Sequence, residues 1–127
     1  MKNTFTKEER LCSRGLIDKL FHDGSSFVLY PFRVVFLTVD YELPTGVQVI
    51  LSVSKRKFKR AYMRNRIKRK MREAYRLQKG DILYPGIRLK SVNLLLAIQY
   101  VAHEDLPFDQ YRLKMNKVLN QIIHEVA

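Results

Sequence analysis

KRKFKRAYMRNRIKRKMREAYR, residues 55–76, is the stretch from which the rest of the chain can be interpreted. It holds 12 of the 24 Lys and Arg residues but a single acid, Glu73. Outside it, 12 bases are balanced by 11 acids, so the formal net charge of +12 is concentrated in this stretch. A dense cationic surface is typical of proteins that bind a polyanion, and at neutral pH the obvious polyanion is a nucleic-acid backbone.

The same stretch has the apolar spacing of a helix. Met63, Ile67, Met71 and Ala74 recur at intervals of four, four and three, which predicts one buried stripe. Basic residues repeat every four positions on a neighbouring face: Arg60, Arg64, Lys68, Arg72 and Arg76. Like charges four residues apart repel each other, and a merely solvated helix face would mix the two signs. The pattern therefore favours a face that binds an anionic ligand.

Patterns elsewhere predict an α+β fold of one domain, residues 1–127, with helices packed on one small sheet. We expect a first helix with Thr6 as its N-cap and an end near Gly24, then strands over residues 26–30, 32–39 and 47–53, the last two forming an antiparallel hairpin. Gly80 and Asp81 should end the basic helix, and Pro85 and Gly86 lie in the predicted linker that follows. Residues 92–100 are mostly apolar and predict a central strand, and Pro107 precedes a last amphipathic helix.

Several classes of protein are disfavoured by the sequence. There is no apolar run near the ~20 residues that span a bilayer, and the charged N-terminus does not look like a secretory signal. The lone Cys12 cannot form an internal disulfide, which is compatible with a reducing cytosol. His22, His103 and His124 are scattered without the spacing of metal ligands. We therefore expect no catalysis by this chain alone.

Aromatic residues cluster on the first two predicted strands. Phe27, Tyr30, Phe32 and Phe36 lie there, and their pattern has two interpretations. They are core residues, or the sheet is open on one side and they form a stacking platform for unpaired bases.

The sequence KRAYMRNRIKR, residues 59–69, resembles the signature of the bacterial ribonuclease P protein subunit. Arg72, Glu73, Ala74 and Arg76 continue the resemblance. The lead-in LSVSKR (51–56), the N-terminal TKEERL (6–11) and FHDG (21–24) are also similar to that family and occur in the same order.

The resemblance implies the element order αβββαβα, with a four-stranded sheet and a left-handed βαβ crossover through the basic helix. Pattern analysis alone predicts the usual right-handed crossover. It further implies a cytoplasmic protein that binds a catalytic RNA and the 5′ leader of precursor tRNA. The RNA and its Mg²⁺ would hydrolyse the substrate, and neither a membrane nor an obligatory protein partner is expected.

Site residues follow from the same resemblance. The catalytic RNA would contact Lys55, Arg56, Lys59, Arg60, Arg64, Asn65, Arg66, Lys68, Arg69, Arg72 and Arg76. The leader would lie in a groove between the first helix and the sheet, contacting Ile17, Phe21, Phe32, Val34 and Phe36. A shift of one residue in the strand would present Val35 and Leu37 instead. Metal ligands are not indicated by the sequence.

Two other classes of function remain open at this point. One is a stand-alone RNA- or DNA-binding protein, ribosomal or regulatory, with no enzyme attached. The other is a structural protein whose basic face binds acidic partners. Cleavage of precursor tRNA at low Mg²⁺, with the cognate RNA added, separates the first hypothesis from both.

Overall fold

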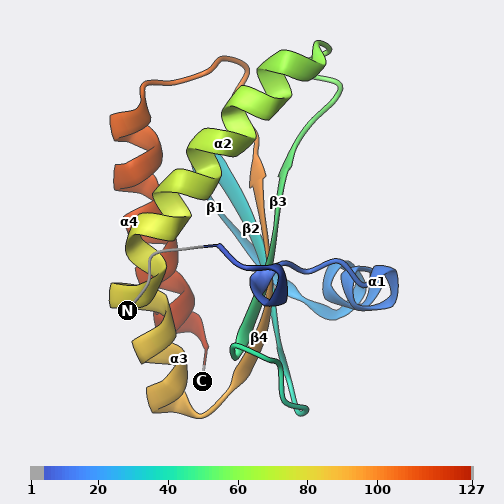
Figure 1. Ribbon diagram of the computed structural model, residues 1–127, viewed down its shortest axis with the longest axis vertical. Helices are drawn as coiled ribbons and strands as arrows, with labels where there is room; N and C mark the ends of the chain where they lie inside the picture. The colour runs from blue at the N-terminus through green and yellow to red at the C-terminus, as the bar shows by residue number, and fades with distance from the viewer. Residues whose placement is uncertain (1–4, 127) are drawn as a thin grey trace.

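A four-stranded mixed sheet forms the centre of the computed structural model, which describes residues 5–126 (Figure 1). The elements are the 3-10 helix η1 (Lys7–Glu9), α1 (Arg14–Asp23), β1 (Ser25–Leu29), β2 (Phe32–Val39), β3 (Val47–Val53), α2 (Ala61–Gln78), the π-helical segment η2 (Lys79–Leu83), α3 (Tyr84–Lys90), β4 (Asn93–Tyr100) and α4 (Phe108–Glu125). The predicted α+β class and the order αβββαβα are confirmed, with α3 as an addition.

β4 lies inside the sheet, as its apolar sequence predicts. The strand order is β1-β2-β4-β3, with β4 antiparallel to β2 and parallel to β3. Leu94, Leu95, Leu96, Ala97 and Ile98 are all buried. The predicted hairpin between β2 and β3 is wrong, because β4 is inserted between them. Sequence neighbours pair only at β1 and β2.

The connection from β3 to β4 passes through α2, η2 and α3 on one side of the sheet. Because β3 and β4 are adjacent and parallel, this connection is a βαβ crossover. Figure 1 shows β3 rising to the top of the molecule, α2 descending beside the sheet, and β4 rising again behind β3. The crossover is left-handed, as the family resemblance implied and against the usual preference.

The two faces of the sheet are covered unequally. α2, α3 and α4 lie on one face, and α1 alone lies on the other (Figure 1). Phe32 and Val34 of β2 pack with Ile67 and Met71 under the large helical layer. A smaller apolar cluster around Leu20 joins α1 to the opposite face.

The helical path after β3 is longer than predicted. Gly80 and Asp81 do not end the helix, because the π-helical turn of η2 carries the chain directly into α3. The expected linker residues Pro85 and Gly86 lie in the first turn of α3. A side chain at Gly86 would lie 2.5 Å from Ile123, so glycine allows α3 to approach α4 closely.

The N-terminal segment differs from the single long helix that was expected. Thr6 and Glu9 form a capping box, but it closes only the short η1. α1 begins at Arg14, where the Ser13 side chain accepts a hydrogen bond from the backbone N–H of Leu16. Leu11, between the two, is buried and its N–H donates to the carbonyl of Val49 on β3 at 2.9 Å. Arg10 and Leu11 therefore attach the N-terminal segment to the β3 edge of the sheet.

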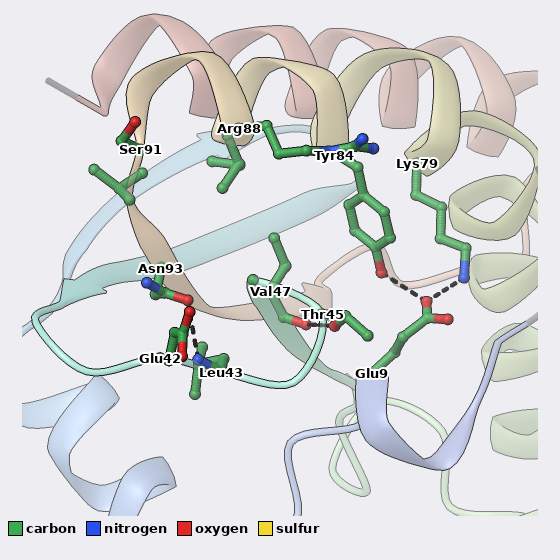
Figure 2. Close-up of a pocket in the computed structure, with 13 residues that line it drawn as sticks. Glu9, Glu42, Leu43, Thr45, Val47, Lys79, Tyr84, Arg88, Ser91 and Asn93 are labelled. Atoms are coloured by element: carbon green, nitrogen blue, oxygen red, sulfur yellow. Dashed lines mark hydrogen bonds and ion pairs between the residues drawn. The ribbon is translucent and has the colours of Figure 1, made fainter.

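A buried ion pair fastens this segment to the helical layer. The Glu9 carboxylate accepts hydrogen bonds from Lys79 and, at 2.7 Å, from the Tyr84 hydroxyl (Figure 2). Glu9 and Lys79 are both buried. Burial alone would raise the pKa of Glu9, but the hydrogen bonds from Lys79 and Tyr84 outweigh it and lower this pKa.

We predict that Glu9→Gln destabilises the protein by about 3–5 kcal/mol, because it removes the carboxylate charge that faces the buried Lys79 ammonium. A lowered carboxyl pKa contributes stability at neutral pH that is lost as the pH falls through the folded-state value. Thermal unfolding from pH 7 downward should therefore show the variant and the wild type converging below the ordinary pKa of glutamate. Glu8→Gln, at the exposed neighbour, is the control and should unfold like the wild type; equal stability of Glu9→Gln at pH 7 would contradict the prediction.

Candidate nucleic-acid interface

α2 separates its apolar and basic residues onto opposite sides. Ile67, Met71 and Ala74 are fully buried against the sheet and α4. At 100° per residue, Asn65 and Arg69 lie on the side opposite this stripe. The arrangement holds the helix by its apolar side and leaves the basic side in solvent, as the spacing predicts.

None of the eleven basic and polar residues that the sequence indicated for RNA binding is buried. Eight are exposed and three, Arg64, Lys68 and Arg76, are partly exposed. They occupy α2 and the loop before it, so the fold brings them together on one surface. We call this surface the basic face; it comprises Lys55, Arg56, Lys59, Arg60, Arg64, Asn65, Arg66, Lys68, Arg69, Arg72 and Arg76.

Some members of the basic face also have partners within the protein. Arg64 donates to the carbonyls of Phe58 and Lys59, at 2.6 and 2.8 Å, and so fixes the loop that leads into α2. Arg76 forms hydrogen bonds of 2.9 and 2.6 Å with Glu73, which lower the pKa of that carboxyl. The side chains of Arg69 and Arg72, in contrast, make no hydrogen bond or ion pair with any residue in 5–126. These two are the clearest candidates for phosphate contacts.

A groove connects the basic face with the N-terminal segment. It has a volume of about 270 Å³, and its lining includes Lys68 and Arg72 of α2, Arg10, and Ile50 on β3. Cationic residues thus border an apolar floor. The positive surface extends beyond the helix to the edge of the sheet.

The predicted face of β2 is wrong. Phe32, Val34 and Phe36 point into the core beneath α2 and α4, and all three are buried. The alternate residues Val35 and Leu37 belong to the cluster around α1 instead. A ring buried in this core has no free face for a base to stack on. Of the four aromatic residues whose role the sequence left open, Phe32 and Phe36 are core residues, Phe27 is partly buried and Tyr30 is exposed.

The α1 side of the sheet carries residues that sequence patterns missed. Arg33 of β2 and Gln99 of β4 are directly opposite each other, and Arg33 Nη1 donates to Gln99 Oε1 at 2.8 Å. Both are partly exposed, as is Ser52, the next residue across the sheet. Only the alternation of β2 could have indicated Arg33, because its partner is 66 residues away.

Ile17 and Phe21 lie on α1, on the same side of the sheet as this polar row. They are four residues apart and therefore neighbours on one helix face. Ile17 is partly buried against the α1 cluster, and the Phe21 ring is 43% exposed. Of the predicted leader contacts, these two remain accessible.

A larger cavity of about 620 Å³ lies between α3, η1 and the loop that precedes β3 (Figure 2). Its lining mixes acids and bases, including Glu9, Glu42, Lys79 and Arg88. It is separate from the basic face. Across residues 5–126, no three His, Cys, Asp or Glu side chains are grouped so that they could hold a metal ion. No helix in the described part of the chain is long and apolar enough to cross a bilayer.

The family model and the related sequences that match this chain indicate the same protein family. The family model described as Ribonuclease P matches residues 5–123. A ribonuclease P protein component of Porphyromonas gingivalis is 36% identical over 121 residues, which cover 95% of this chain and 88% of that protein. The corresponding protein of Chlorobium phaeobacteroides is 29% identical, covering 94% of this chain and 88% of the relative.

Solved structures have the same fold. A Staphylococcus aureus RNase P protein mutant superposes with a TM-score of 0.72 at 20% identity, covering 91% of this chain and 89% of that one. The RNase P protein of Thermotoga maritima gives a TM-score of 0.69 at 23% identity, with coverage of 89% and 96%. The basic helix, the sheet topology and the family match over residues 5–123 agree, and the chain belongs to the ribonuclease P protein family.

Proposed function

We propose that this chain is the protein subunit of ribonuclease P and that it binds the catalytic RNA through the basic face. The observation that carries the proposal is the exposed, strongly basic side of α2, whose one acid is Glu73, in a chain that matches the family over nearly its whole length. Arginine is suited to this role because its planar guanidinium makes paired hydrogen bonds to phosphate.

In this proposal the protein assists and the RNA performs the chemistry. The enzyme is an endoribonuclease that removes the 5′ leader of precursor tRNA. Mg²⁺ acts with the RNA subunit in this proposal, as the family resemblance implies. The role of the chain is to neutralise phosphate charge and to orient the substrate. Its location would then be the cytoplasm, with its RNA.

The α1 side of the sheet is the proposed site for the leader. Phe21 supplies an exposed ring for stacking, and Arg33 with Gln99 supplies polar groups for the backbone or base edges. Ile17 extends the apolar floor. Phe32, Val34 and Phe36 have no place in this revised site, because they are buried on the other face.

The first prediction of the proposed function concerns cleavage activity. Ribonuclease P RNA from the same organism should cleave precursor tRNA at low Mg²⁺ faster with this chain than without it. Rigorously RNA-free protein should not cleave, because residues 5–126 group no three His, Cys, Asp or Glu side chains that could hold a catalytic metal ion. A chain that binds RNA but leaves cleavage unchanged would instead support the stand-alone RNA-binding hypothesis.

The second prediction concerns the basic face. Arg69→Ala and Arg72→Ala should each weaken binding to the RNA subunit, and each should reduce the slope of log K against log salt by about 1. Lys117→Ala, an exposed cation on α4, is the matched control and should leave the slope nearly unchanged. Filter binding at several salt concentrations measures both quantities; an unchanged slope in the Arg69/Arg72 double variant would exclude this face.

The third prediction concerns the leader. Phe21→Ala should weaken binding of precursor tRNA to the holoenzyme by about 1–3 kcal/mol, the usual contribution of a stacked base, and leave mature tRNA nearly unaffected. Leu113→Ala on α4 removes a side chain of similar exposure, 49%, from the opposite layer and serves as the control.

Phe32→Ala completes the comparison for the leader site. This change empties a core position, so it should lower the melting temperature and affect precursor and mature tRNA alike. If Phe21→Ala behaves like Phe32→Ala, the α1 side is not the leader site.

A further inference from the structure

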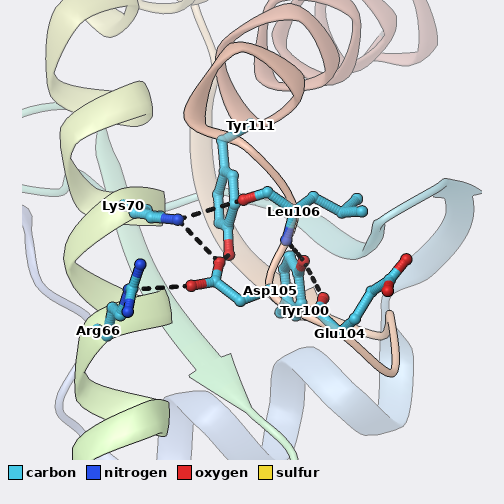
Figure 3. Close-up of polar contacts among 7 residues, drawn as sticks. All are labelled: Arg66, Lys70, Tyr100, Glu104, Asp105, Leu106 and Tyr111. Carbon is cyan, nitrogen blue, oxygen red and sulfur yellow. Dashed lines mark hydrogen bonds and ion pairs between the residues drawn. The ribbon is translucent and has the colours of Figure 1, made fainter.

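Asp105, between β4 and α4, gathers side chains from α2 and α4 (Figure 3). Its Oδ1 accepts hydrogen bonds from the Tyr111 hydroxyl at 2.6 Å and from Lys70 Nζ at 3.0 Å. Its Oδ2 lies 3.1 Å from Nε of Arg66. With 11% of its side chain exposed, the carboxylate is nearly enclosed by these donors.

Buried tyrosines of the core hold the segment that carries Asp105. The Tyr100 hydroxyl donates to the carbonyl of Glu104 at 2.7 Å and accepts from the N–H of Leu106 at 3.1 Å. The rings of Tyr100 and Tyr111 stack at 5.2 Å between centroids. Asp105 is therefore fixed by contacts that do not include Arg66.

Lys70 and Arg66 differ in how many hydrogen-bond donors they leave available for a ligand. Lys70 donates to Asp105 and to the carbonyl of Leu106, and its ammonium lies 5.3 Å from the centre of the Tyr111 ring. Arg66 is 61% exposed and is in contact with Asp105 through Nε. Its two terminal nitrogens make no hydrogen bond with any described residue. A guanidinium held at Nε presents those two nitrogens as a fixed fork, which matches a phosphate.

We propose that Asp105 is a positioning residue, which orients Arg66 for contact with RNA phosphate. This inference rests on the proposed function of the basic face. For RNA affinity, the charge of Asp105 alone predicts the opposite effect from its positioning role. An acid beside a basic face repels phosphate, so removing it should strengthen RNA binding unless its positioning effect is larger.

Asp105→Asn distinguishes the two effects, because loss of positioning weakens RNA binding whereas removal of the negative charge strengthens it. Asparagine has one acceptor and one donor group, so either orientation turns an N–H group toward Arg66 or toward Lys70 and Tyr111. We expect affinity for the ribonuclease P RNA to fall by about three- to tenfold, as is typical when a mobile side chain must be ordered on binding. Glu104→Gln, which removes the neighbouring exposed charge, is the control and should bind as well as the wild type or slightly better.

A double-variant cycle ties the effect to Arg66. In an Arg66→Ala background, Asp105→Asn should change RNA affinity by less than about twofold, because the residue that it positions is gone. Equal losses in both backgrounds, or tighter binding by Asp105→Asn, would overturn the proposal. Thermal unfolding of each variant confirms that binding is measured on folded protein.

A measurement without RNA tests the positioning separately from the proposed function. In the free wild-type protein, the NMR order parameter of the Arg66 Nε–H should exceed about 0.6, whereas that of Arg69, which has no described partner, should be lower. Equal mobility of the two side chains overturns the positioning role even if the variants fold poorly. If Arg66 is ordered but the wild type does not bind ribonuclease P RNA, the proposed function fails and the positioning geometry stands.

Discussion

The structure depends on the pairing of β4 along both of its edges. β4 is hydrogen-bonded to β2 on one side and to β3 on the other, and its central residues are buried on both faces. A strand of this kind must be shielded from solvent on both faces of the sheet. α2 and α4 pack on one face and α1 packs on the other. The crossover that delivers α2 to the large layer follows from placing β4 next to β3. The position of the basic helix is thus set by the core of the sheet.

Repulsion among the basic residues of α2 lowers the stability of the helix. Like charges three or four residues apart destabilise a helix by about 0.2–0.5 kcal/mol per pair. Full burial of a side chain such as Ile67 or Met71 contributes about 1.5–3 kcal/mol, so a few apolar contacts outweigh the repulsion. The intramolecular bonds of Arg64, to Phe58 and Lys59, further hold the start of the helix. The fold therefore keeps the cations in place in the free protein, and a polyanion would relieve their repulsion on binding.

Local patterns explain what could be predicted from the sequence, and distant pairings explain what could not. The basic helix and the central strand have signals within a few residues, the spacing of Ile67 and Met71 and the apolar run of β4. The neighbour of β3 depends on a strand some forty residues later, so the expected hairpin was wrong. The face of β2 depends on a one-residue choice of register, which placed Phe32 on the wrong side. The contacts of Arg33 with Gln99 and of Arg66 with Asp105 join residues that no local pattern connects.

The narrow buried stripe of α2 has a consequence for how such a chain changes over evolutionary time. Ile67, Met71 and Ala74 are constrained by the packing of the sheet, whereas the side chains of Arg69 and Arg72 make no polar contact with a described residue. Substitutions on the buried side should therefore affect folding, and those on the basic side should affect the partner of the proposed function. Under the proposed function, a lineage could adjust its surface to a drifting RNA by altering one side of a single helix, with no change to the scaffold that carries the helix.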